Sequence, residues 1–263
     1  MANKHLWRAS VLSSSRITPN MQRIVLSGDD LSNFPQPIEG GYIKLLFSAE
    51  GKVLASEAEQ QRMLPAKPVM RTYTVRRFDP LGKALTVDFV IHAESEGPAS
   101  RWAQTAAVGD NIVFAGPGPA KIVDTGADWH LLAGDMTALP ALSVNLQQLP
   151  RDAKGYAIIE VATKDDIQDL SAPEGFALNW VFNEAHGQSE AFVNAIQETA
   201  WLEGRPYVWC ACEFSTMRRL RKYFKQTRHL DKQSLYISSY WKQGNTEDQH
   251  KVVKQQDALS ESA

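Results

Sequence analysis

Short runs in which apolar and polar residues alternate fill the first part of the chain. These runs predict β-strands, and they are residues 16–28, 41–51, 69–94 and 110–123. The third run predicts two strands joined by a turn at Asp79–Gly82. Residues 50–68 are polar and predict a long excursion with one helical turn. Many short strands with closely spaced turns are typical of an antiparallel barrel or sandwich.

Near residue 128 the pattern changes to strands that alternate with amphipathic helices. Strands are predicted at residues 129–135, 155–166, 176–184, 206–214 and 234–241. Helices are predicted at residues 136–150, 189–204 and 215–230. This alternation favours a parallel α/β sheet. We therefore predict two domains, a β-barrel over residues 1–125 and an α/β domain over residues 126–263, whose polar tail frays at its end.

Composition excludes several classes of protein. The chain has 263 residues, of which 43% are hydrophobic and 22% charged, so it has enough apolar residues for a folded core. The net charge is −2, which does not indicate a nucleic-acid partner. Mean hydropathy is −0.32 and no apolar run is long enough to span a bilayer, so membrane insertion is not expected. The N-terminus lacks the apolar core of a secretory signal.

Cysteine and histidine usage limits the chemistry. Cys210 and Cys212 are the two cysteines, which is too few for a disulfide framework or for the four ligands of a usual iron–sulfur cluster. A reduced, cytoplasmic chain is the simplest interpretation. The histidines show no metal-ligand spacing, and we expect neither a metal site nor a catalytic triad. Redox activity would therefore need a different cofactor.

The segment Arg71-Thr72-Tyr73-Thr74-Val75-Arg76 lies on a predicted strand and suits a flavin. Tyr73 offers an aromatic face for stacking, and Arg71 or Arg76 offers a cation for the phosphates. On a strand, Arg71 and Tyr73 share one side, and Thr72 and Thr74 share the other. A threonine hydroxyl or a backbone amide could bond the reactive N5 edge of the flavin ring.

A second segment, Gly97-Pro98-Ala99-Ser100-Arg101-Trp102, follows the strand that ends near His92. Glycine and proline precede a short helical pattern, so the N–H groups of the first turn point ahead of the helix. Such a turn is a binding site for an anion such as a pyrophosphate.

These segments and three others resemble the siderophore-interacting protein family, which comprises FAD-containing ferric-siderophore reductases of the ferredoxin–NADP reductase superfamily. The first two carry the patterns R-x-Y-T-x-R, D-F-V-x-H and G-P-A-S-x-W-A. The others are residues 134–141 (GDMTALPA), residues 212–220, and residues 240–250 with Glu247 and His250. The chain departs from the family at Ala93 and Cys212, where the family has glycine, and at Lys242, where it has arginine.

The resemblance implies a Greek-key FAD-binding β-barrel followed by a nucleotide-binding-like α/β domain, and a monomeric enzyme. It implies that the ring and phosphates of FAD are bound by a set of residues from both domains. These are Arg71, Thr72, Tyr73, Thr74, Arg76, Asp88, Phe89, Val90, His92, Gly97, Pro98, Ala99, Ser100, Trp102, Thr137, Glu213, Tyr240 and Trp241. An anionic ferric siderophore would dock on Lys44, Lys121 and Lys242. Outer-sphere electron transfer needs no catalytic acid, base or nucleophile.

The electron donor stays open between NAD(P)H and reduced ferredoxin. The segment GDMTALPA favours a nucleotide, whereas the basic stretch 205–232 could attract an acidic ferredoxin or a nucleotide 2′-phosphate. A solvated basic helix face is the simpler interpretation of that stretch. Two other functions fit the same fold: a general NAD(P)H:flavin or ferredoxin reductase, and a siderophore-binding protein that has lost its flavin.

Overall fold

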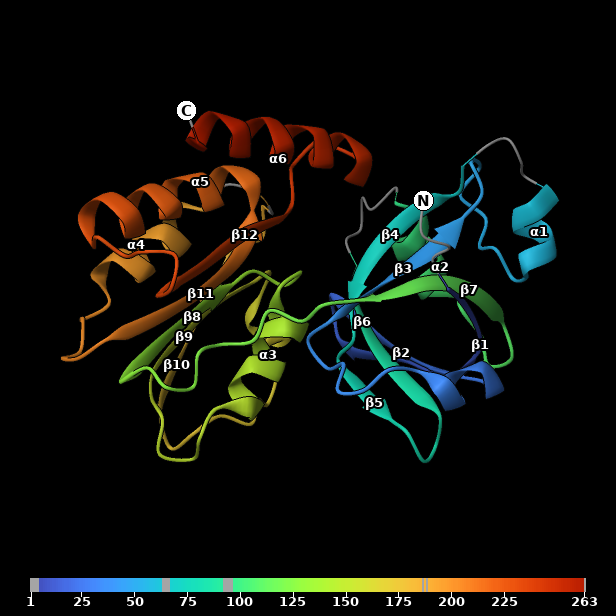
Figure 1. Cartoon of the computed structure of the whole chain (residues 1–263), viewed down its shortest axis with the longest axis horizontal. Helices are drawn as coiled ribbons and strands as arrows, with labels where there is room; N and C mark the ends of the chain where they lie inside the picture. Colours follow the sequence, from blue (N-terminus) through green and yellow to red (C-terminus); the bar gives the residue numbers. More distant parts are fainter. Residues whose placement is uncertain (1–4, 63–66, 92–96, 186, 188, 263) are drawn as a thin grey trace. The chain divides into compact units, whose positions relative to one another are not determined.

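The computed structural model describes residues 5–62, 67–91, 97–185, 187 and 189–262, and the chain divides into two compact units (Figure 1). The first unit is Met1–Lys121 and the second is Ile122–Ala263. The antiparallel β-structure followed by a parallel α/β sheet, predicted from the sequence, is confirmed. Every helix among the described residues is too short or too polar to cross a lipid bilayer.

The first unit is a seven-stranded antiparallel sheet in the order β4-β3-β7-β1-β2-β6-β5. Its strands are β1 (Leu6–Thr18), β2 (Met21–Ser27), β3 (Tyr42–Phe47), β4 (Val69–Thr74), β5 (Arg77–Asp79), β6 (Ala84–Val90) and β7 (Asn111–Gly118). The sheet curls, since the ring of Tyr73 on β4 lies 4.3 Å from that of Phe89 on β6, although these two strands are not paired. This curl turns one face of the sheet into an interior.

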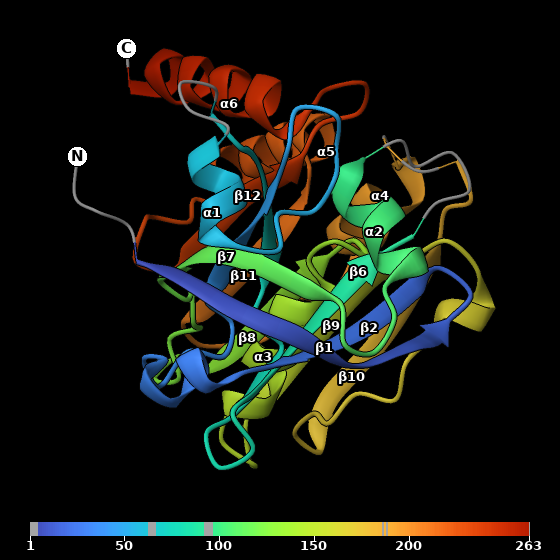
Figure 2. The same cartoon turned by 90° about the vertical axis from the view of Figure 1, so that its right-hand side faces the viewer.

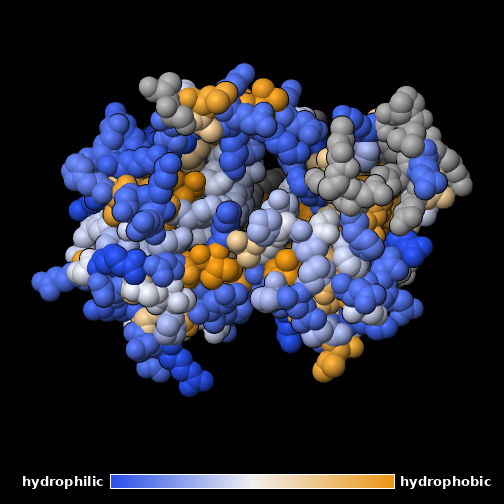
Figure 3. Space-filling model, in the orientation of Figure 1, coloured by the Kyte–Doolittle hydropathy of each residue, from blue (hydrophilic) through white to orange (hydrophobic). Residues whose placement is uncertain are grey.

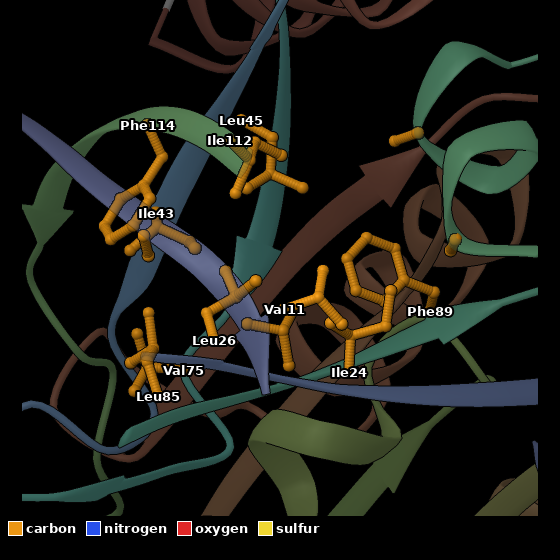
Figure 4. Packing of buried hydrophobic residues seen from close by; sticks show 14 of the residues in the cluster. Val11, Ile24, Leu26, Ile43, Leu45, Val75, Leu85, Phe89, Ile112 and Phe114 are labelled. Carbon is orange, nitrogen blue, oxygen red and sulfur yellow. The ribbon is translucent and has the colours of Figure 1, made fainter. Parts of the chain in front are cut away.

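Aliphatic and aromatic side chains fill that interior (Figure 4). Ile24, Leu26, Ile43 and Leu85 are each inaccessible to solvent and come from three different strands, β2, β3 and β6. They alternate with outward-facing residues, as the period of a strand requires. The excursion at 50–68 contains α1 (Glu57–Arg62), the helical turn predicted there.

Strand β1 begins earlier than the sequence pattern predicts, which places no strand before residue 16. Its first half alternates with Trp7, Ala9 and Val11 buried, but its second half runs through Ser13–Ser15, which are weak strand formers. Pairing with β2 over residues 10–18, and with β7 over its first half, holds it extended. Tertiary pairing here overrides local propensity.

The second unit is a parallel five-stranded sheet in the order β10-β9-β8-β11-β12, so the strand order reverses between β8 and β11. Its strands are β8 (Trp129–Gly134), β9 (Lys154–Val161), β10 (Gly175–Phe182), β11 (Pro206–Glu213) and β12 (Leu235–Trp241). Its helices are α3 (Leu139–Gln148), α4 (Glu190–Glu198), α5 (Phe214–Lys222), which continues as a π-helical turn over Tyr223–Thr227, and α6 (Glu247–Ser262). Helices α4 and α5 cover one face through Phe192, Ile196 and Leu220.

The C-terminal tail forms helix α6, so the expectation of a frayed tail is wrong for Glu247–Ser262. Its carboxylates bind the basic residues of α5 and the turn after it. Asp257 pairs with Arg221 at 2.7 Å and with Arg218 at 3.1 Å, and Glu261 pairs with Lys225 at 3.1 Å. The sequence of the tail is polar and gives no sign of packing. The fold shows that its carboxylates pair with the cations of α5 and of the turn after it.

These ion pairs also change the interpretation of the basic stretch. Arg219 of α5 is held by Glu190 at 2.6 Å, in addition to the cations bound by α6. The visible face over α4 and α5 is largely hydrophilic (Figure 3). Most of the α5 cations expected to attract a partner are thus already paired with carboxylates of the same unit.

Candidate functional site

Strand β4 lies at the edge of the first sheet and carries Tyr73. The rings of Tyr73 and Phe89 are tilted by 38°, and the ring of Phe89 lies 5.7 Å from that of Trp102. Val69 and Tyr73 both pack against the barrel core, so alternation places Arg71 on the same side. Tyr73 is only half-buried, and part of its ring is accessible to a bound group.

The two candidate arginines differ in setting. Arg71 is half-buried and donates from Nη1 to the carbonyl of Met70 at 2.9 Å. Burial lowers the pKa of Arg76, and the backbone N–H of Arg76 donates to the carbonyl of Thr86 at 2.9 Å. Both are half-buried cations that an anionic ligand would stabilise.

The carboxylate of Asp88 is occupied by an arginine that the sequence motifs do not include. Arg23 of β2 donates to both oxygens of Asp88 at 2.7 Å. Val87 and Phe89 pack in the core, so Asp88 points to the other face of β6. A contact between the Asp88 side chain and a cofactor would have to compete with this bidentate pair. Arg23 meets Asp88 because the register of β2 against β6 places the two residues opposite each other. That register cannot be predicted from the sequence of either strand alone.

Helix α2 (Pro98–Thr105) packs against β6 (Figure 2). Gly97 is the N-cap and has no side chain that could cap the first turn. A Cβ atom built on Gly97 would meet no atom within 4 Å among the described residues, so no described residue crowds the Gly97 Cα atom. Ala99 and Ser100 are buried, and Ser100 Oγ donates to the carbonyl of Val90 at 3.4 Å. His92 lies outside the described residues.

These residues fit FAD. Tyr73 offers a ring face, Arg71 a guanidinium, and the first turn of α2 a set of N–H groups for a pyrophosphate. Trp102 Nε1 is buried without a hydrogen-bond partner in the described part of the chain. A buried indole N–H is normally bonded, so it is a further donor for a bound group.

Four predicted residues lie in the second unit, at the carboxyl ends of its strands. Asp135 accepts from Thr137 Oγ1 at 2.5 Å and from Trp241 Nε1 at 2.8 Å, and so joins two of them. Glu213 accepts from the N–H groups of Ser215 and Thr216 and thereby caps α5. The fourth, Tyr240, packs edge-on to the ring of Trp209. Asp135 and Glu213 therefore accept hydrogen bonds from backbone N–H groups and side chains of their own unit.

A row of buried and half-buried polar groups crosses this edge of the sheet. Asp135, Glu160, Asn183 and Cys212 each lie two positions beyond a residue of the core that α4 and α5 cover. Burial raises the pKa of Asp135 and of Cys212, and raises that of Glu160 to about 7. Within the described residues, buried Glu160 Oε2 and Asn183 Nδ2 make no hydrogen bond of good geometry, although the side chains of Ser189 and Asn183 lie near enough to Glu160 to offset part of its pKa shift. Burial in this row thus favours the neutral form of the Asp135 and Glu160 carboxyl groups.

The three lysines predicted to bind a siderophore are divided between the units. Lys44 Nζ donates to Thr72 Oγ1 at 3.3 Å and lies 5.7 Å from the centre of the Tyr42 ring. Lys121 is exposed after β7. Lys242 Nζ lies 4.9 Å from the centre of the Phe214 ring in the second unit. The structure pairs Lys44 with Thr72 and Tyr42 of the same unit.

Comparisons with known proteins identify the family. A model described as the siderophore-interacting FAD-binding domain matches residues 10–121, and one described as siderophore-interacting protein matches residues 127–244. Ferric vibriobactin reductase ViuB of Vibrio cholerae is 32% identical over 88% of this chain and 88% of its own. The chain belongs to the siderophore-interacting protein family.

Two further relatives are a ferric-chelate reductase and a protein of known crystal structure. The NADPH-dependent ferric-chelate reductase of Escherichia coli is 29% identical over 88% of this chain and 91% of its own. The crystal structure of the siderophore-interacting protein SipS from Aeromonas hydrophila matches with a TM-score of 0.82 and 29% identity, over 98% of this chain and 99% of that one. Both units are therefore present in a solved relative.

Proposed function

We propose that this family member is an FAD-dependent reductase that reduces ferric iron in siderophore chelates, with electrons from NAD(P)H or reduced ferredoxin, and releases iron in the cytoplasm. The observation that carries the proposal is that Tyr73 and Arg71 of β4 and the first turn of α2, which has no side-chain cap, belong to one unit that matches an FAD-binding family model. Both cysteines are free, which agrees with a reducing compartment.

FAD supplies the chemistry when bound, because it accepts two electrons as a hydride and passes them on singly. The protein holds it in place. Tyr73, supported from behind by Phe89, would stack on the ring, and Arg71 with the N–H groups of α2 would bind the pyrophosphate. A hydroxyl of Thr72 or Thr74 would bond the ring edge.

Reduction explains how iron would be released. A siderophore holds ferric iron through hard, charged oxygen atoms, and one added electron lowers the charge on the metal and weakens those bonds. Each hydride equivalent would therefore serve two ferric chelates. This step requires proximity of the chelate to the ring, and positively charged residues such as Lys44 and Lys121 favour an anionic chelate.

The experiment is a two-step anaerobic stopped-flow measurement. The flavin protein is first mixed with NADH, NADPH or reduced ferredoxin, and flavin bleaching identifies the donor. The reduced protein is then mixed with a ferric siderophore or with free FMN. We expect reoxidation by the ferric chelate with formation of Fe(II). Faster reoxidation by free FMN than by any chelate would favour a general flavin reductase, and no bleaching by any donor would overturn the proposal.

A further inference from the structure

The outer face of strands β3 and β4 carries a group of residues that the pyrophosphate and ring-stacking contacts do not use. Ile43 and Leu45 of β3 are buried in the barrel core, so Tyr42 and Lys44 point to the opposite face. Thr72 lies opposite Lys44 in the register and shares that face, where the two side chains are hydrogen-bonded at 3.3 Å. We call Tyr42, Lys44 and Thr72 the outer-face group.

The ring of Tyr42 is seated on a glycine. Tyr42 lies opposite Gly118 of β7, and a Cβ atom built on Gly118 would lie 2.0 Å from Tyr42 Cζ. Any larger residue at position 118 would therefore displace the ring. Because the ring is held before a ligand arrives, little conformational entropy is lost when a ligand packs against it.

One ammonium group lies beside this ring. Lys44 Nζ lies 5.7 Å from the ring centre, within the range of a cation–π contact. Lys121 follows Gly118 by three positions and is exposed. An aromatic ring beside an ammonium group favours a ligand that is both aromatic and anionic, because stacking and charge act on the same molecule.

We infer that the outer-face group selects catecholate over hydroxamate chelates of trivalent iron, with Tyr42 as the specificity residue. The inference rests on the proposed function. A tris-catecholate complex is a trianion whose ligands are aromatic rings, so it meets both Tyr42 and Lys44. A tris-hydroxamate complex of simple ligands is neutral and aliphatic, so it neither stacks on Tyr42 nor is attracted by the charge of Lys44. The ring of Tyr42 contributes the part of the selection that charge alone cannot.

Gallium(III) complexes test this inference without redox chemistry, because Ga(III) has the charge and coordination of Fe(III) and is not reduced by flavin. Three probes separate the ring from the charge: the tris-catecholate of 2,3-dihydroxybenzamide (aromatic trianion), the tris-oxalate (non-aromatic trianion) and the tris-acetohydroxamate (neutral). Dissociation constants are measured by fluorescence titration of the full-length flavin protein. We expect catecholate to bind more tightly than oxalate, and oxalate more tightly than hydroxamate.

The variants assign these differences to residues. Tyr42→Leu and Gly118→Ala should each weaken the catecholate about three- to tenfold and leave the oxalate unchanged, while Tyr42→Phe binds like wild type. Lys44→Gln should weaken both trianions and spare the neutral complex. Tyr207→Leu, in the second unit, and Lys52→Gln, on an exposed loop, are the matched controls.

Two results would overturn the inference: equal binding of catecholate and oxalate by wild type, or equal loss of all three probes in Tyr42→Leu. The iron complexes of the same ligands test the proposed function separately. If the reduced flavin reduced none of them, the reductase function would fail, whereas the gallium titrations alone decide the role of Tyr42.

Discussion

Replacing Glu160 by glutamine should make the second unit more stable at alkaline pH. Glu160 is buried at the end of β9, the Asp135 carboxyl group is close by, and the side chains of Ser189 and Asn183 offset the shift of its pKa only in part. Burial is the main reason that the pKa of Glu160 rises from 4.5 to about 7. Glutamine keeps the shape and removes the ionisation.

The magnitude follows from proton linkage. Below pH 4.5 the Glu160 carboxyl is neutral in both states. Between pH 4.5 and about 7 the unfolded chain ionises while the folded chain stays neutral, so stability falls as pH rises through this window. Each step of one in pKa is worth about 1.4 kcal/mol, so the full loss above pH 7 is on the order of 3 kcal/mol. A glutamine side chain at this position does not ionise and would avoid the loss.

Urea unfolding at a series of pH values measures this effect. Trp129, Trp180, Trp201, Trp209 and Trp241 are five of the seven tryptophans, so fluorescence reports mainly on the second unit. The difference between Glu160→Gln and wild type should be small near pH 5 and should grow with pH. Titrating groups that do not interact with Glu160 cancel in this difference. Parallel profiles of the two proteins, or the same change in the exposed control Glu184→Gln, would refute the reasoning.

Three other substitutions probe the packing of the two units by urea unfolding, which is followed by tryptophan fluorescence for the second unit and by circular dichroism for Ile24→Ala in the first. Asp257→Asn should lose about 2 kcal/mol, because it leaves Arg221 without this partner in a partly buried pair; a change below about 0.5 kcal/mol would show that α6 docks by other contacts. Burial lowers the pKa of His250 below 6.5, so wild-type stability should fall as pH drops from 7 to 5, and His250→Gln should flatten that fall; equal slopes would contradict it. Ile24→Ala should cost about 2–5 kcal/mol, and a loss under about 1 kcal/mol would mean that the barrel core collapses around the gap.

The sequence predicted the architecture because hydrophobic periodicity is a local signal. The alternation in β2 and β3 and the helical spacing in α4 are visible in their own segments, so both sheets and their order could be foreseen. The serine-rich half of β1 and the polar helix α6 have no such signal. This half of β1 is held extended by pairing with β2, and α6 is held by ion pairs with the cations of α5.

The candidate site shows the same division. Motif order predicted Tyr73, Arg71 and the turn at Gly97 as candidate site residues, and the structure shows that they lie on the strand and at the helix start expected for them. The partner of Asp88 could not be found, because Arg23 is 65 positions away and reaches it only through strand register. Nor could the sequence show that Asp135 and Glu213 are bonded to groups of their own unit. Side-chain partnerships between distant strands need the fold.

The most direct test of the account is the flavin content of the purified protein and of two variants. Bound FAD is measured from its visible absorbance and by release and chromatography, and its dissociation constant by titration of the apoprotein. The account predicts that wild type binds FAD, that Tyr73→Ala and Arg71→Ala each weaken it by about 1–3 kcal/mol, and that Tyr73→Phe retains it. A protein that takes up no FAD, or variants that bind it as tightly as wild type, would contradict a flavin on β4 and α2.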